Sequence, residues 1–235
     1  MTKTSPSKIH CVENDPGSSA YIRDATPELR AEFDLRAGVG LPNPFPFEHV
    51  MIDIETMSLH PHNALILSIG MIEFDPTPIN GLVMGKRSLI LPNLEQQLLL
   101  GREVSTGTQK FWKDPALKAA SDHWANADGA RTNLALVCQR VSMFCEGRSH
   151  VRVWANGTQF DLSNLVELNR QLGDAGQEAL WHYQAPRDMR TFCRETPATR
   201  LSCSTDETGA NGVPHEPVYD CINQAWQVWA HWDGS

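Results

Sequence analysis

Closely spaced cysteines are missing from this sequence of 235 residues. The six cysteines stand at positions 11, 138, 145, 193, 203 and 221, without a Cys-x-x-Cys pair and without a short Cys/His spacing that suggests zinc. They read as separate thiols, which argues against a structural zinc site. Separate thiols also indicate a reducing compartment.

Apolar runs long enough to enter a membrane are missing as well. The first eight residues, Met1 to Lys8, lack the apolar centre of a signal peptide. No apolar run approaches the roughly eighteen residues that a membrane-spanning helix requires. Together with the separate thiols, these absences predict a cytoplasmic protein that has no membrane partner.

Positive charge is scarce, because 20 Lys and Arg residues accompany 28 Asp and Glu residues and the formal net charge is −8. Nucleic-acid-binding proteins usually present a basic surface, so this balance counts against such a partner. The objection weakens if some acidic residues hold metal ions, since bound cations reverse the local charge. A hydrophobic content of 41%, with seven Trp, is sufficient for one large α/β domain.

The chain divides into two regions of different composition. Residues 1–48 are rich in Pro, Ser, Asp and Glu and place Pro42, Pro44 and Pro46 at alternate positions, which predicts an irregular N-terminal arm. This arm could be disordered, which we favour, or bind a partner, or pack against the domain. Residues 49–235 form the predicted domain.

Hydrophobic patterns in this domain predict an α/β fold with a mixed sheet flanked by helices. Three strands joined by short connections form an antiparallel meander. A further strand feeds a helix through an Asn-Gly turn. The predicted strands cover residues 49–56, 64–74, 85–91, 151–155 and, weakly, 181–184; the predicted helices lie within 94–146 and over 160–172, 186–193 and from 217 onward.

Two carboxylates interrupt the first of these strands. Alternate side chains of an extended chain share a face, so Asp53 and Glu55 point to the same side. Two like charges in the centre of a sheet are costly unless a cation lies between them or one carboxyl is protonated. We favour a divalent metal ion; the alternative is an amphipathic edge strand whose acidic face meets water.

Three more polar residues stand where strands and helices meet. Asp161 lies at a strand-to-helix junction, His215 precedes the last helix, and Asp220 lies one turn inside it. Taken singly, they could be a helix N-cap, a surface loop residue and a first-turn residue favoured by the helix dipole. Their joint occurrence with the two strand carboxylates favours a common site.

With these five residues in this order, the chain resembles the DnaQ-like DEDDh 3′–5′ exonucleases of the ribonuclease H-like superfamily. Its stretches Met-Ile-Asp-Ile-Glu-Thr-Met, Ile-Leu-Ser-Ile-Gly, Val-Trp-Ala-Asn-Gly-Thr-Gln-Phe-Asp and Arg-Asp-Met-Arg-Thr look like the exodeoxyribonuclease VIII-like and mycobacterial exoribonuclease-like branch of bacteria and phages. The resemblance covers roughly residue 49 to the end. It implies a ribonuclease H-like mixed sheet and a bacterial or phage-infected cell, and it allows a homodimer.

The resemblance also implies a role for each of the five residues in hydrolysis assisted by two metal ions. Asp53 would bridge both ions, while Glu55 and Asp220 would hold the ion on the nucleophile side. Asp161 would serve the leaving-group side, partly through water. His215 would be the general base, a task that suits a side chain whose pKa lies near working pH. Oxygen ligands without thiolate suit Mg²⁺ or Mn²⁺.

Substrate contacts follow from the same resemblance. Thr56 and Met57, just past the catalytic strand, would meet the terminal nucleotide, with core packing an equal alternative for Met57. Asn156 and Phe160 stand close to the junction carboxylate, where an aromatic ring could stack on a base. For Trp112 we favour the core over stacking.

The segment around the last motif departs from the family pattern. Relatives commonly carry small or polar residues where this chain has Glu216-Pro-Val-Tyr219, and the preceding residues 194–214 are nearly without apolar side chains. We therefore expect a mobile loop that keeps His215 away from the carboxylates until a 3′ end binds. For Asp188 we favour a helix N-cap over a role in the site.

The predicted function is a two-metal-ion 3′–5′ exonuclease that hydrolyses single strands or 3′ overhangs of RNA or DNA to nucleoside 5′-monophosphates. One alternative is a catalytically weak nucleic-acid-binding or interaction module on the same fold, which the net acidity supports. Another is a ribonuclease H-like endonuclease, which would leave the histidine before the last helix without a role.

Overall fold

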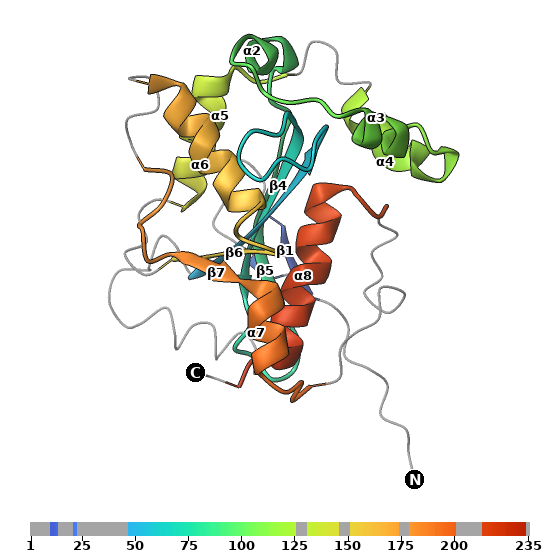
Figure 1. Ribbon diagram of the computed structural model, residues 1–235. Coiled ribbons are helices and arrows are strands. Elements are labelled where there is room, and N and C mark those ends of the chain that lie inside the picture. Colours follow the sequence, from blue (N-terminus) through green and yellow to red (C-terminus); the bar gives the residue numbers. More distant parts are fainter. Residues whose placement is uncertain are drawn as a thin grey trace.

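The computed structural model describes residues 10–13, 21–22, 47–125, 131–145, 151–173, 179–200 and 213–233 (Figure 1). Most of the predicted N-terminal arm lies outside these ranges. Within the arm, the structure contains two short strands, β1 (His10–Glu13) and β2 (Tyr21–Ile22). In the described ranges, no helix combines the length and the apolar character needed to cross a bilayer.

The centre of the fold is a mixed sheet with the strand order β2-β1-β5-β4-β3-β6-β7. Its middle is the predicted meander, since β4 pairs antiparallel with both β3 and β5. On either side of it, β1 pairs parallel with β5, and β6 pairs parallel with β3 and β7. The remaining strands are β3 (His49–Thr56), β4 (Ile66–Asp75), β5 (Val83–Ile90), β6 (Arg152–Ala155) and β7 (Pro186–Asp188).

Helices cover both faces of the sheet, which confirms the predicted α/β class with a mixed sheet flanked by helices. In Figure 1, α5 and α6 lie on one side of the strands and α7 and α8 on the other, with α3 and α4 beyond the start of α8. The helices are α2 (Leu94–Leu99), α3 (Thr106–Trp112), a 3₁₀ turn (Pro115–Leu117), α4 (Lys118–Ala125), α5 (Leu134–Cys145), α6 (Asp161–Gln171), α7 (Met189–Glu195) and α8 (Pro217–His231).

Strand β3 separates two hydrophobic layers, as its alternating pattern predicts. Val50, Ile52 and Ile54 are buried in the cluster that contains side chains of α5 and α6. Met51 is buried in the second cluster, with side chains of α7 and α8. The two strand carboxylates continue this second face, so the polar end of β3 lies on the side of α8.

A glycine allows α8 to approach the sheet closely at this end. A Cβ on Gly70 of β4 would lie 2.3 Å from the carbonyl carbon of Pro217, the first residue of α8. Gly70 is also the register partner of Asp53. Contact between helix and strand therefore brings the first turn of α8 next to the carboxylates of β3.

Two predicted elements differ from the structure. The weak strand predicted at 181–184 is instead β7 at Pro186–Asp188, and the helix predicted from 186 begins at Met189. An edge strand tolerates a proline at its first residue, because that position need not donate to the ladder. The predicted loop from 194 also begins too early, since α7 continues to Glu195. Beyond it, Arg200 donates to the carbonyl oxygens of Pro76 and Trp229 at 2.8 and 3.4 Å.

Candidate active site

The first part of the candidate site is the carboxylate pair of β3. Asp53 and Glu55 are both half-buried and lie on one face of the strand, as predicted, and this is the face that packs against α8. The Oδ1 atom of Asp53 accepts a hydrogen bond from Nε2 of Gln224, on α8, at 2.7 Å. The pair therefore lies between a central strand and the last helix, where access to water is limited.

Asp161 enters the site from the start of α6. The turn before it contains Gly157, whose φ of 115° suits glycine, and this turn reverses the chain between β6 and α6. Asp161 is only 6% exposed, and its Oδ1 atom accepts a hydrogen bond from the backbone N–H of Ile54 at 3.3 Å. This bond ties the start of α6 to β3 between its two carboxylates.

His215 and Asp220 arrive with the first turn of α8. Glu216 caps the helix, because its carboxylate accepts from the backbone N–H groups of Val218 and Tyr219 at 3.3 and 2.8 Å. His215, just before the cap, has a φ of 65°, and its backbone N–H donates to Oδ2 of Asp220 at 3.0 Å. The segment Glu216-Pro-Val-Tyr219, which departs from the family pattern, is thus a capped helix start that fixes the backbone of His215.

The imidazole of His215 lies against the carboxylates. Its Nδ1 atom is 3.7 Å from Oε1 of Glu55, and the side chain is 43% exposed. The contact with Glu55 raises the pKa of His215, which favours the protonated ring. The structure thus places His215 beside the carboxylates, where the cap and the bond to Asp220 hold its backbone. The expectation that a loop keeps His215 away until a 3′ end binds stays a prediction. Residues 201–212 of the predicted loop lie outside the described residues.

Asp53, Glu55, Asp161 and Asp220, which we call the carboxylate cluster, all have raised pKa values. Burial is the main cause for each of them. For Asp53, repulsion from the other three adds to burial, and its pKa lies well above the usual range. For Asp161 the pKa rises to about 7. The cluster thus concentrates negative charge that is costly without protons or a cation.

The geometry of these groups fits a divalent cation. Ligand atoms of Glu55, His215 and Asp220 all lie within 4.8 Å of one another. Asp53 interacts electrostatically with both of these acids and with Asp161, so the four carboxylates lie near one another. A set of carboxylate oxygens without thiolate is the kind of site that hard divalent cations prefer. Cys221 is buried nearby, but its Sγ donates to the carbonyls of β3 and β4.

The predicted contacts next to β3 are largely engaged within the protein. Thr56 is buried, and its hydroxyl donates to the carbonyl of Ser58 at 2.7 Å. Met57 packs partly buried in a cluster with Trp112, and its backbone N–H and C=O bond to Leu65 and Ser105 at 2.8 Å each. The apolar side chain of Met57 is thus the group that remains for a nucleotide.

The predicted contacts near α6 are partly exposed. Asn156 lies in the turn after β6, and its carbonyl accepts from Arg190 at 3.1 Å. Phe160 precedes α6 and packs partly buried against the core. Asp188 is the N-cap of α7, as predicted, since its carboxylate accepts from the N–H of Thr191 at 2.8 Å.

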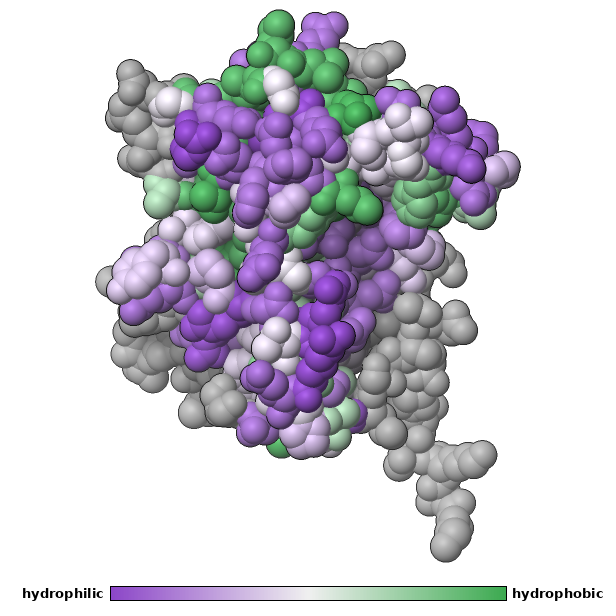
Figure 2. All heavy atoms as spheres, in the orientation of Figure 1, coloured by the Kyte–Doolittle hydropathy of each residue, from purple (hydrophilic) through white to green (hydrophobic). Residues whose placement is uncertain are grey.

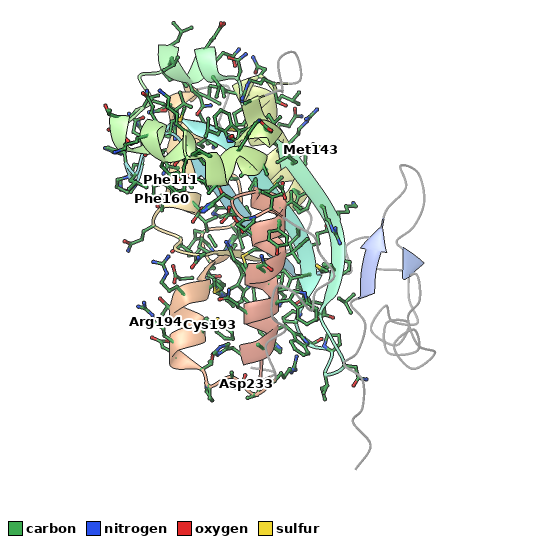
Figure 3. The ribbon with its side chains drawn as sticks, turned by 90° about the vertical axis from the view of Figure 1, so that its right-hand side faces the viewer. Phe111, Met143, Phe160, Cys193, Arg194 and Asp233 are labelled. Carbon is green, nitrogen blue, oxygen red and sulfur yellow. The ribbon has the colours of Figure 1, made fainter. Side chains whose placement is uncertain are left out.

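Phe111 is a candidate contact that the sequence analysis missed. Trp112 is buried and donates through Nε1 to the carbonyl of Thr56 at 2.8 Å, so it belongs to the core. Phe111 beside it is 43% exposed, and its ring lies edge-on to that of His215 at 5.3 Å. In Figure 3, Phe111 and Phe160 appear on the same side of the molecule. Helical phase decides which of two adjacent aromatics is outside, and α3 is too short for its pattern to reveal that phase.

Comparisons with known proteins identify a family and a fold that this chain shares. Residues 48–232 match the family model described as the 3′–5′ exoribonuclease Rv2179c-like domain. No curated protein matches the chain. Among solved structures, the zinc ion bound form of an E. coli ExoI–ssDNA complex has 15% identity and a TM-score of 0.50, covering 77% of this chain and 39% of that chain. The apo structure of an exonuclease I has 16% identity and a TM-score of 0.50, covering 77% and 41%.

These likenesses differ in what they show. The two structural matches establish a shared fold, and the chain spans about two fifths of the length of those proteins. The family match covers most of the domain and confirms the predicted family resemblance. The chain belongs to the family of Rv2179c-like 3′–5′ exoribonuclease domains.

Proposed function

We propose that this protein is a two-metal-ion 3′–5′ exonuclease that hydrolyses single-stranded nucleic acid to nucleoside 5′-monophosphates. The observation that carries the proposal is the proximity of four carboxylates and one histidine that come from β3, α6 and the start of α8. The predicted setting, the cytoplasm of a bacterial or phage-infected cell, belongs to the proposal.

Two divalent cations, Mg²⁺ or Mn²⁺, would supply the positive charge that stabilises the attacked phosphate and the leaving 3′-oxygen. Asp53 would bridge them, Glu55 and Asp220 would hold the cation on the nucleophile side, and Asp161 would serve the leaving-group side. The raised pKa values support these roles, because burial, and at Asp53 also repulsion, disfavours the charged carboxylates, and a bound cation would offset both effects.

His215 would accept the proton from the attacking water. Its half-exposed ring lies beside Glu55, whose charge stabilises the imidazolium that forms. The capped helix start and the bond from the backbone of His215 to Asp220 hold the ring near the cluster. These contacts would keep the proposed base within reach of the cluster.

The proposed substrate is a single strand with a free 3′ end, of RNA or DNA. Phe111 and Phe160 offer aromatic rings near the cluster, and stacking on aromatic rings suits unpaired bases of any sequence. The family is described by exoribonuclease activity, whereas one structural relative was solved with single-stranded DNA. Both polymers thus belong in the test.

The resemblance also allows a homodimer. Light scattering during size-exclusion chromatography would test this oligomeric state.

The test uses single-stranded oligonucleotides labelled at either end, with Mg²⁺ or Mn²⁺. We expect the 5′-labelled strand to shorten progressively and the 3′-labelled strand to release labelled mononucleotide at once. Asp53→Ala should remove this activity, and Glu195→Ala, an exposed acid at the end of α7, should keep it. Internal cuts would indicate the endonuclease, and tight binding without turnover would indicate the non-catalytic module.

A further inference from the structure

Gln224 is a buried polar residue beside the carboxylate cluster that has no role so far. It lies on α8 one turn after Asp220, so both side chains emerge from the same face of the helix. Only 6% of it is exposed. Its Nε2 donates to Oδ1 of Asp53 at 2.7 Å, which is the length of a charge-assisted hydrogen bond.

The other end of the Gln224 amide has no hydrogen-bond partner among the described residues. Its Oε1 atom is buried and accepts no hydrogen bond from the described part of the chain. An ionised Asp53 only accepts hydrogen bonds, so the amide must present its NH₂ group to that carboxylate. This requirement leaves Oε1 free to accept from another donor. Buried acceptors without a partner are rare in native proteins, and ordered water commonly supplies the missing donor.

A second buried atom on this face shares the property. Ser68 of β4 is 2% exposed, and its Oγ has no hydrogen-bond partner among the described residues. Ser68 is the register partner of Glu55, and directly opposite residues of an antiparallel pair share a face. Unpartnered buried oxygens thus accompany both carboxylates of β3, where water around a cation would find acceptors.

The chemistry of glutamine suits this place better than a charged residue would. A lysine could also donate to Asp53, but its positive charge would compete with a cation for the carboxylate. A glutamate could not donate when ionised and would add repulsion. A neutral donor orients the carboxylate and leaves its negative charge available.

We propose that Gln224 is a positioning residue of the metal site: it fixes the carboxylate of Asp53 through Nε2, and its Oε1 accepts a hydrogen bond from water bound to the cation. The proposal rests on the proposed function, since it assigns a cation to the carboxylate cluster. It predicts that Gln224 determines how tightly this cation binds, without being a ligand itself.

The test compares Mn²⁺ affinity of the full chain with that of Gln224→Met, measured from the EPR signal of free Mn²⁺. Met keeps the length and packing of the side chain and removes both polar atoms. We expect Mn²⁺ to bind about 10- to 100-fold more weakly, the usual loss for a group that orients a metal ligand. The matched control is Gln227→Met, the same change at an exposed position of the same helix, which should bind Mn²⁺ like the parent.

Thermal unfolding in EDTA separates a fold defect from a binding defect. Gln224→Met should unfold cooperatively near the temperature of the parent. If it does not fold, Gln224→Asn replaces it, because the shorter amide falls short of Asp53 and should show the same loss. Mn²⁺ affinity equal to that of the parent in a folded variant would overturn the proposal while the proposed function stands. If the parent protein bound no Mn²⁺, as is expected of the Asp53→Ala variant, both the proposal and the proposed function would be overturned.

Discussion

The protein contains two buried polar clusters that differ in how their groups are paired. The carboxylate cluster brings like charges together, and polar atoms beside it have no hydrogen-bond partner in the part of the chain that the structure describes. The second cluster, which we call the arginine cluster, consists of Arg102, Asn164 and Gln97, all at most 3% exposed. It joins the segment between β3 and β4 to α2 and α6.

Every side chain of the arginine cluster is hydrogen-bonded within the protein. Arg102 donates to the carbonyl of Ala64 at 2.8 Å and to Oδ1 of Asn164 at 3.0 Å. The Oδ1 atom of Asn164 also accepts from the N–H of Ala64 at 2.9 Å. Gln97 accepts from the N–H of Ile66 at 2.7 Å and donates to its carbonyl at 2.8 Å. These bonds satisfy the backbone that enters β4.

The comparison shows how burial can serve structure in one place and chemistry in another. Buried polar groups with complete hydrogen bonds hold a fold together. Buried like charges with incomplete bonds lower stability, and the surrounding structure maintains them where a ligand will complete them. A change in the arginine cluster should therefore affect mainly stability, and a change in the carboxylate cluster mainly activity.

The largest effect should come from Asp53→Ala. Loss of the bridging carboxylate should reduce the rate of hydrolysis by at least about 10³-fold, as loss of transition-state stabilisation does elsewhere. The metal-free protein should be at least as stable as the parent, because repulsion within the cluster falls. Labelled-strand assays and thermal unfolding in EDTA measure the two effects. If Asp53→Ala strongly lowered the free energy of unfolding as well as the rate of hydrolysis, the two clusters would not differ in serving activity and stability.

His215→Ala should have the next largest effect on activity. Loss of the general base should lower kcat by roughly 10²-fold or more. Mn²⁺ affinity should change less than in Asp53→Ala, since the four carboxylates remain. Single-turnover rates across pH should lose the limb that depends on a deprotonated base. Unchanged kcat and an unchanged pH profile would exclude the assigned role.

Arg102→Met tests the other side of the comparison. The change leaves the buried carbonyl of Ala64 without its donor and removes one of the two donors to Oδ1 of Asn164, which should lower the free energy of unfolding by about 3 kcal/mol. Hydrolysis well below the unfolding temperature should stay within a few-fold of the parent. Arg170→Met, which breaks only an exposed pair with Glu167, is the control and should cost much less. Urea unfolding that gave equal losses for both variants would contradict the scaffold role.

The pH dependence of stability gives a smaller effect. Burial raises the pKa of Asp161 to about 7, above its value in the unfolded chain, so the folded state binds more protons between about pH 4 and 7. Without divalent cations, the free energy of unfolding should therefore fall as pH rises through this window, by on the order of 2 kcal/mol. Mg²⁺ should reduce the fall. A free energy of unfolding that rises with pH in EDTA would contradict this prediction, because it would show that folding favours the charged form of Asp161.

The smallest effect should come from Phe111→Ala. Loss of one stacking ring should raise KM for a single strand by about tenfold, while Mn²⁺ affinity stays unchanged. Leu98→Ala, an exposed apolar residue in α2, is the control. The control lies apart from the cluster, since Figure 2 shows hydrophobic residues gathered at the top of the molecule, where α2 lies, above a mostly hydrophilic face. An equal KM change in both variants would indicate a general surface effect.

The sequence predicted the parts of the fold that depend on local pattern. Alternation in β3 placed Asp53 and Glu55 on one face, and the periodicity of α8 located its start at Pro217, both as observed. The position of β7 in the sequence was missed because a three-residue strand has too short a hydrophobic pattern.

Partners distant in the chain could not be predicted. The bond from Gln224 to Asp53 spans 171 positions, and the contact of Gly70 with Pro217 depends on how α8 crosses the sheet. The position of His215 depends on a cap and a backbone bond that form only when α8 does. Sequence order thus indicated which residues meet, and packing determined how closely.

The most direct test of the central claim is a crystal structure of the protein soaked with Mn²⁺ and a nucleoside monophosphate. We predict two anomalous peaks about 4 Å apart, both within bonding distance of Asp53, with the phosphate between them and His215. Peaks confined to the protein surface, or a cluster that stays free of Mn²⁺ at saturating concentration, would contradict the account.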